Sequence, residues 1–86
     1  MTGKLNSLRE KIDDVDLRLL KLLSARAKLV QQVGAVKDGA GVYRPGRESQ
    51  ILRRIADLNG GPLPAVALQR IYTEIMSACR ALEDSV

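Results

Sequence analysis

Two cations share one face of the long amphipathic segment that opens the sequence. Arg26 interrupts a run of apolar residues with heptad spacing, and Lys37 follows eleven residues later. Eleven residues make about three turns of an α-helix, so both side chains are expected on nearly the same face. A cation on an apolar seam is costly unless an anion meets it. The spacing favours a small anionic ligand, although Arg26 reaching out to solvent and Lys37 interacting with the helix dipole are simpler alternatives.

Arg9 lies on the same segment, seventeen residues before Arg26. Seventeen residues place Arg9 roughly 100° away from Arg26 around one helix, so one helix cannot easily aim both at one ligand. Two antiparallel copies of the helix can, because Arg9 of one chain then reaches the Arg26 region of its partner. A solvated position for Arg9 is the alternative interpretation.

The other candidate residues lie in two later segments. Arg47 and Glu48 open the second helical segment, and Cys79 and Glu83 lie one turn apart near the end of the third. Three of them have a structural alternative: Glu48 can offset a helix dipole, Cys79 can be a small buried apolar residue, and Glu83 can be surface charge. The chain has no histidine and one cysteine, so it lacks the usual general base and the commonest zinc ligand, and we expect no metal site.

Helices are the elements that must position these residues. Apolar residues recur every three or four positions, which is the periodicity of an α-helix. Glycines and prolines separate three such segments, and the sequence shows no strand pattern. The sequence therefore predicts one all-α domain over residues 1–86, with helices at about 5–37, 45–58 and 64–83.

The first predicted helix is unusually long for a chain of 86 residues. About 33 residues at 1.5 Å per residue give a helix of roughly 50 Å, which one small chain cannot cover by itself. Its apolar seam consists of Leu5, Leu8, Ile12, Val15, Leu19, Leu22, Leu29, Val33 and Val36. We therefore expect a second copy of the chain to cover this seam.

Charge and composition narrow the class of protein further. The formal net charge of +4 favours an anionic partner, but the basic residues are spread along the chain, which argues against nucleic acid. No stretch has the length and apolarity of a signal peptide or a membrane span, so no membrane contact is expected. Cys79 is the only cysteine, which fits a reducing compartment and predicts a cytoplasmic protein.

The order of these residues resembles the all-helical class of chorismate mutases. The resemblance is carried by LREKIDDVD at 8–16, LLKLLSAR at 19–26, VGAVK at 33–37, YRPGRE at 43–48 and EIMSACRALE at 74–83. It covers nearly the whole chain in one register. Within this class, the chain looks most similar to the mutase domain at the front of bifunctional mutase–prephenate dehydratases.

The resemblance implies an intertwined homodimer in which the long helices pair antiparallel and each site takes one arginine from the other subunit. The implied reaction is the rearrangement of chorismate to prephenate in phenylalanine and tyrosine biosynthesis, without a cofactor. The resemblance also implies a role for each candidate residue. Three arginines, Arg9, Arg26 and Arg47, would bind the two carboxylates of the substrate. Lys37 would donate to the ether oxygen and Glu48 would bind the ring hydroxyl, while Cys79 and Glu83 would line the floor of the site, with Glu83 near the ether oxygen.

Three positions depart from part of the class, and the alternatives to a mutase remain open here. Some members have glutamine in place of Glu83, and some have a hydroxyl residue in place of Cys79. Some have an acidic residue in place of Arg44. An isochorismate-pyruvate lyase shares the fold and several of the cations. A non-catalytic helical module for regulation or dimerisation would keep the helices without the reaction, and a basic helical dimer on nucleic acid would show steep salt dependence.

Overall fold

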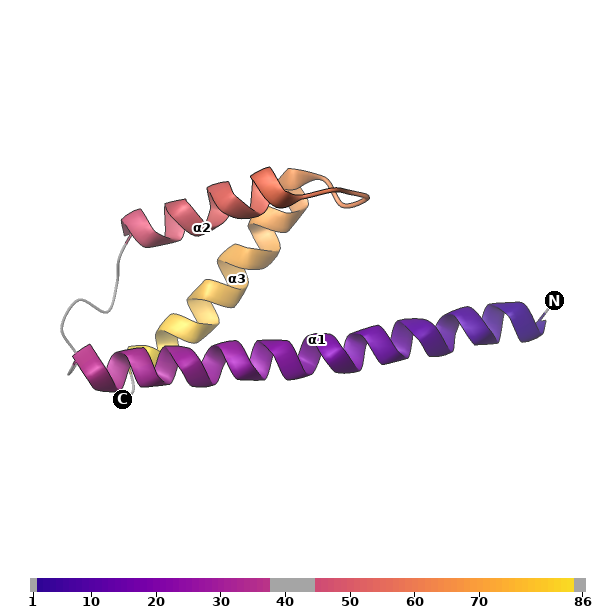
Figure 1. The fold of residues 1–86 in the computed structure, drawn as a ribbon, viewed down its shortest axis with the longest axis horizontal. Coiled ribbons are helices and arrows are strands. Elements are labelled where there is room, and N and C mark those ends of the chain that lie inside the picture. The colour runs from indigo at the N-terminus through magenta and orange to yellow at the C-terminus, as the bar shows by residue number, and fades with distance from the viewer. Residues whose placement is uncertain (1, 38–44, 85–86) are drawn as a thin grey trace.

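Three α-helices make up the computed structural model, which describes residues 2–37 and 45–84 of the chain. Helix α1 spans Thr2–Lys37, α2 spans Pro45–Leu58 and α3 spans Ala65–Asp84 (Figure 1). No strand occurs in these two ranges. The prediction of an all-α fold with three helices and a very long first helix is confirmed.

Helix α1 determines the length of the molecule. Its 36 residues correspond to about 54 Å of helix, and the longest dimension of the chain is 56 Å. The helix begins at Thr2, three residues before the predicted start. Extending an existing helix adds one hydrogen bond per ordered residue, so the polar residues before Leu5 continue it.

A short turn at 59–64 joins α2 to α3 and is fixed by Asn59. The Gly61 backbone N–H donates to Asn59 Oδ1 at 2.9 Å, and Asn59 Nδ2 donates to the Leu63 carbonyl at 2.8 Å. Gly61 has φ +78°, a left-handed conformation that glycine adopts without a steric penalty. The Leu68 N–H then donates to the Pro64 carbonyl at 3.2 Å, which starts α3. This turn holds α2 against α3.

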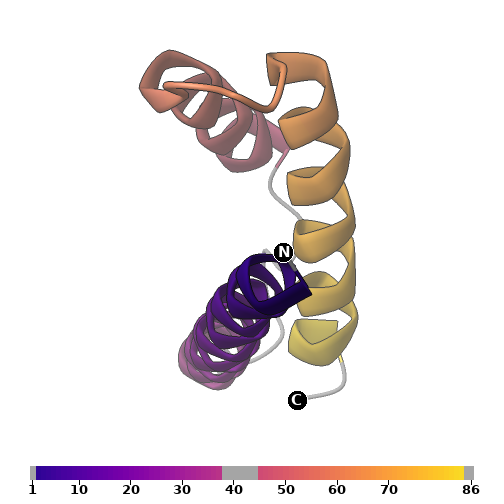
Figure 2. The same cartoon turned by 90° about the vertical axis from the view of Figure 1, so that its right-hand side faces the viewer.

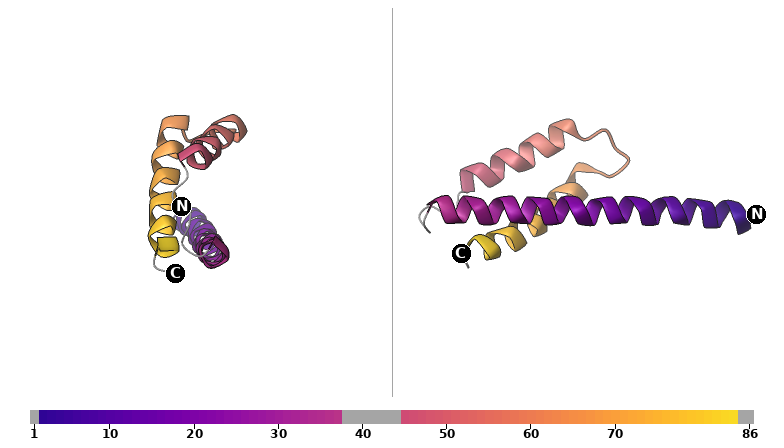
Figure 3. Two further views of the ribbon diagram at one scale, coloured as in Figure 1. Left: turned by 90° about the vertical axis from the view of Figure 1, so that its left-hand side faces the viewer. Right: turned by 60° about the horizontal axis from the view of Figure 1, so that its bottom comes forward.

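Helix α3 contacts both other helices and runs from α2 at its N-terminal end to α1 at its C-terminal end (Figures 1 and 2). In the described residues, α1 and α2 do not contact each other. The N-terminal half of α1 projects beyond α2 and α3 (Figure 3). The candidate site must therefore be built around α3 and the C-terminal half of α1.

The apolar core of a single chain is small. Met76 and Cys79 are the buried apolar side chains of the described residues, at 5% and 6% exposure. The radius of gyration is 16.3 Å, whereas a compact chain of this length would have about 12 Å. All nine apolar seam residues of α1 are exposed in the single chain, from 43% at Val33 to 85% at Val36.

Neither described range contains a helix long and apolar enough to cross a membrane.

Candidate functional site

An ion pair joins α2 to α3 at one of the predicted site residues. Arg80 Nη1 donates to Glu48 Oε2 at 3.1 Å, and the two side chains retain 34% and 28% of their exposure. Arg80 was not among the site residues predicted from the sequence. The two residues are 32 positions apart on different helices, so no local spacing signals that they meet.

Arg47 occupies the exposed side of the same turn of α2. Its Nη1 donates to Gln50 Oε1 at 3.0 Å, three residues further along the helix. Adjacent residues on a helix are about 100° apart, so Arg47 and Glu48 point in different directions. In the single chain, Glu48 faces α3 and Arg47 faces solvent.

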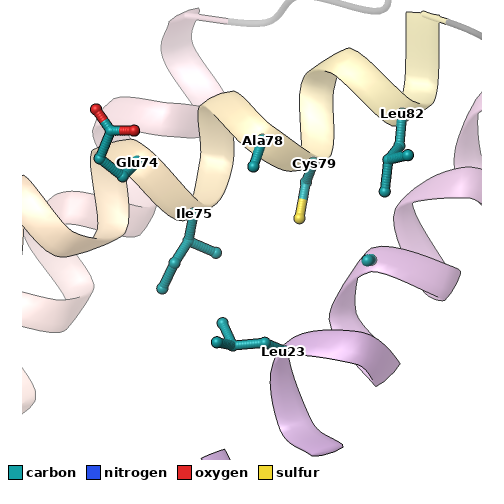
Figure 4. A pocket seen from close by; sticks show the side chains of 7 residues that line it. Leu23, Glu74, Ile75, Ala78, Cys79 and Leu82 are labelled. Atoms are coloured by element: carbon teal, nitrogen blue, oxygen red, sulfur yellow. The ribbon is translucent and has the colours of Figure 1, made fainter. Parts of the chain in front are cut away.

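Cys79 lies at a cavity between α1 and α3. The cavity has a volume of about 370 Å³ and is lined by Leu23, Ala27, Glu74, Ile75, Ala78, Cys79 and Leu82. Figure 4 shows the Cys79 sulfur pointing toward α1, whereas the Glu74 carboxylate points away from Leu23. The lining is mostly apolar, so this cavity by itself does not suit a dianion.

The two arginines of α1 are far apart in one chain. Arg26 is half-buried and immediately precedes Ala27 of the cavity. Arg9 is exposed and lies on the projecting half of α1, about 25 Å from Arg26 along the helix axis. A single chain therefore does not bring Arg9 to the other candidate residues.

Two predicted site residues end their helices. Lys37 is the last residue of α1, and Glu83 is the penultimate residue of α3. The C-terminal ends of α1 and α3 lie close together, and α2 begins over the same end of the molecule (Figures 1 and 3). The side chains of Lys37 and Glu83 lie outside the part of the chain that the structure describes, so their predicted contacts stay predictions. Arg44 also lies outside the residues that the structure describes.

The arrangement favours binding by charge and hydrogen bonds. Arg26, Glu48 and Arg80 are contributed by three different helices, so the packing of the helices sets their relative positions. Within residues 2–37 and 45–84, no three His, Cys, Asp or Glu side chains form a group that could hold a metal ion. Arginine forks and carboxylates are suited to small ligands that carry carboxylate and hydroxyl groups.

Comparison with known proteins gives consistent matches over almost the whole chain. The family model for chorismate mutase type II matches residues 8–84. The bifunctional chorismate mutase/prephenate dehydratase of Neisseria gonorrhoeae is 47% identical over 75 residues, which are 87% of this chain and 21% of that relative. The chain thus spans about a fifth of the length of this curated relative.

Solved structures match the fold over nearly their full length. A chorismate mutase from Thermus thermophilus has a TM-score of 0.89 and 34% identity, covering 94% of both chains. A chorismate mutase from Helicobacter pylori, in complex with prephenate, has a TM-score of 0.90 and 29% identity. That match covers 96% of this chain and 92% of the other.

Proposed function

Because the chain belongs to the type II chorismate mutase family, we propose that it catalyses the rearrangement of chorismate to prephenate. The observation that carries the proposal is the family match over residues 8–84, which contains every candidate site residue from Arg9 to Glu83. The Helicobacter pylori structure, which matches this fold, holds prephenate. Family membership confirms the resemblance seen in the sequence. The proposed role is a step in aromatic amino acid biosynthesis.

The proposed reaction is an intramolecular Claisen rearrangement, which breaks an ether C–O bond and forms a C–C bond within one molecule. The protein has two tasks. It must hold the dianionic substrate in its compact reactive conformation, which is a positioning effect. It must also stabilise the negative charge that develops on the ether oxygen, which calls for donors fixed in place beforehand.

We assign the positioning task to Arg9, Arg26 and Arg47. A guanidinium group binds a carboxylate through two parallel hydrogen bonds, so it fixes direction as well as charge. The half-buried position of Arg26 supports its part in this assignment. To bind the substrate, Arg47 would have to replace its hydrogen bond to Gln50 with hydrogen bonds to a substrate carboxylate.

We assign the ether oxygen to Lys37 and Glu83, and the ring hydroxyl to Glu48. The close approach of the ends of α1 and α3 supports the pairing of Lys37 and Glu83 (Figure 1). A carboxylate accepts a hydrogen bond from a hydroxyl, which suits Glu48. Cys79 is 6% exposed and borders the apolar cavity, which supports a packing role at the floor of the site.

We also propose that two chains form an intertwined dimer in which Arg9 serves the partner's site. The exposed apolar seam of α1 and the extended shape of the single chain support this assembly. Burial of apolar surface is the main favourable term in association, so a seam of this length is an efficient contact for a second copy. The separation of Arg9 from Arg26 supports an antiparallel arrangement.

The single, buried and unpaired Cys79 supports a reducing compartment, and we propose that the protein acts in the cytoplasm.

If the apolar seam of α1 forms the dimer interface, a charged residue introduced there should disrupt the dimer. Sedimentation of the parent is expected to give about twice the 9.4 kDa mass of one chain. Leu22 is 68% exposed in the single chain, so Leu22→Glu would be mild in a monomer. In the dimer it places a charge in an apolar interface, and we expect dissociation or unfolding. Gln32→Glu, at an exposed polar position of α1, is the matched control and is expected to remain dimeric.

The proposed activity is tested by following chorismate disappearance by absorbance and identifying the product. Prephenate formation is the expected result. The same protein is then given isochorismate, and release of pyruvate from it as the main activity would replace the mutase assignment with a lyase. A folded dimer that converts neither compound would contradict the proposed function.

A further inference from the structure

We propose that Arg80 is a positioning residue that orients Glu48 for recognition of the substrate's ring hydroxyl. This inference rests on the proposed function and adds a residue to it. Arg80 contributes to the site from α3, whereas Glu48 comes from α2. The pair therefore lets the packing of two helices set the direction of one carboxylate.

The geometry supports orientation by Arg80 through one oxygen of Glu48. Arg80 Nη1 contacts Oε2 at 3.1 Å. Among the described residues, Oε1 of Glu48 makes no side-chain hydrogen bond or ion pair, so it remains available to accept from a hydroxyl. A glutamate side chain has three rotatable bonds, and binding one of its oxygens reduces the freedom of the other. Orientation before binding removes part of the entropy cost of association.

The exposure of the pair argues that its main effect is on function. The two side chains retain 34% and 28% of their exposure, and ion pairs that water reaches contribute little to folding stability. The neighbours of Arg80 along α3 are also informative. Cys79 precedes it at the cavity, and Glu83 follows within one turn. Arg80 therefore lies on the same turn of α3 as the residues assigned to the site floor, and its side chain reaches α2 through Glu48.

The test compares two substrates in the intact protein. Arg80→Met is expected to lower kcat/KM for chorismate about tenfold, mainly through a higher KM, as when one charge-assisted hydrogen bond is weakened. For the chorismate analogue in which hydrogen replaces the ring hydroxyl, the same variant should stay within about twofold of the parent. Arg80→Lys keeps the charge without the planar fork and should recover part of the loss on chorismate.

Two further variants complete the design. Arg70→Met removes the same charge from an exposed position of α3, and it should leave kcat/KM for both substrates at the parental value. In Glu48→Gln/Arg80→Met, the loss on chorismate should be no larger than in Glu48→Gln alone, because the carboxylate that Arg80 orients is already absent. Thermal unfolding of Arg80→Met should match that of Arg70→Met.

The outcomes separate this inference from the proposed function. A parent protein that does not convert chorismate overturns both. If the parent is active and Arg80→Met lowers kcat/KM equally for both substrates, Arg80 acts on the substrate carboxylates or on the fold, and the inference is wrong. An Arg80→Met variant with parental kinetics on chorismate also overturns it.

Discussion

Arg26→Ala and Lys37→Ala are each expected to lower kcat/KM for chorismate by roughly 10²–10³-fold, the usual cost of one transition-state donor. The fold should survive both changes, because removing a charge from an apolar helix face relieves a desolvation cost. We expect melting temperatures within about 3 °C of the parent. Steady-state kinetics and thermal unfolding of the two variants measure the two halves of this prediction.

The kinetic pattern should also differ between the two variants. Arg26 is assigned to a substrate carboxylate, so its loss should raise KM as well as lower kcat. Lys37 is assigned to charge that develops in the transition state, so its loss should fall mainly on kcat. Lys28→Ala, at an exposed position of α1, is the control and should behave as the parent. Near-parental turnover in both variants would contradict the anion-binding interpretation of α1.

Mixing Arg9→Ala chains with Arg26→Ala chains is expected to restore activity that neither variant has alone. If Arg9 serves the partner's site, a hybrid dimer has one site with both arginines and one with neither. Complete exchange of equal amounts should recover about one quarter of parental activity, because half of the dimers are hybrids and each has one intact site. The measurement is chorismate turnover before and after subunits are exchanged.

Controls define what the mixing experiment can show. Exchange is verified independently with chains that carry different affinity tags. A mixture of Arg26→Ala with Lys37→Ala chains should recover nothing, since both residues are assigned to the same chain's site. Verified exchange without recovery in the Arg9 mixture would mean that Arg9 acts within its own chain or not at all.

Much of the fold is determined by local patterns in the sequence. Apolar spacing and helix-breaking residues predicted the ends of α2 correctly and those of α3 within one residue. The start of α1 was less well predicted, because helix extension through polar residues depends on cooperativity and leaves no apolar signal. The order of charged and apolar residues also sufficed to identify the family, which the match over residues 8–84 confirms.

The sequence also predicted part of the candidate site. Residue type and helical spacing singled out Arg26 and Lys37 as an unusual pair on one face, and the resemblance gave roles to the other candidates, Arg9, Arg47, Glu48, Cys79 and Glu83. Spacing within one helix is fixed by the backbone geometry, so such inferences need no tertiary structure. They cannot specify which side chains on other helices complete the site.

Tertiary structure decided the contacts between helices. The pairing of Glu48 with Arg80 and the placement of Cys79 at a cavity with Leu23 both depend on how α3 crosses its neighbours. That crossing follows from the Asn59 turn and from side-chain packing along α3, which couple residues far apart in sequence. Periodicity reports only the face of a helix on which a residue lies, and the partner it meets there is determined by the packing of the whole chain.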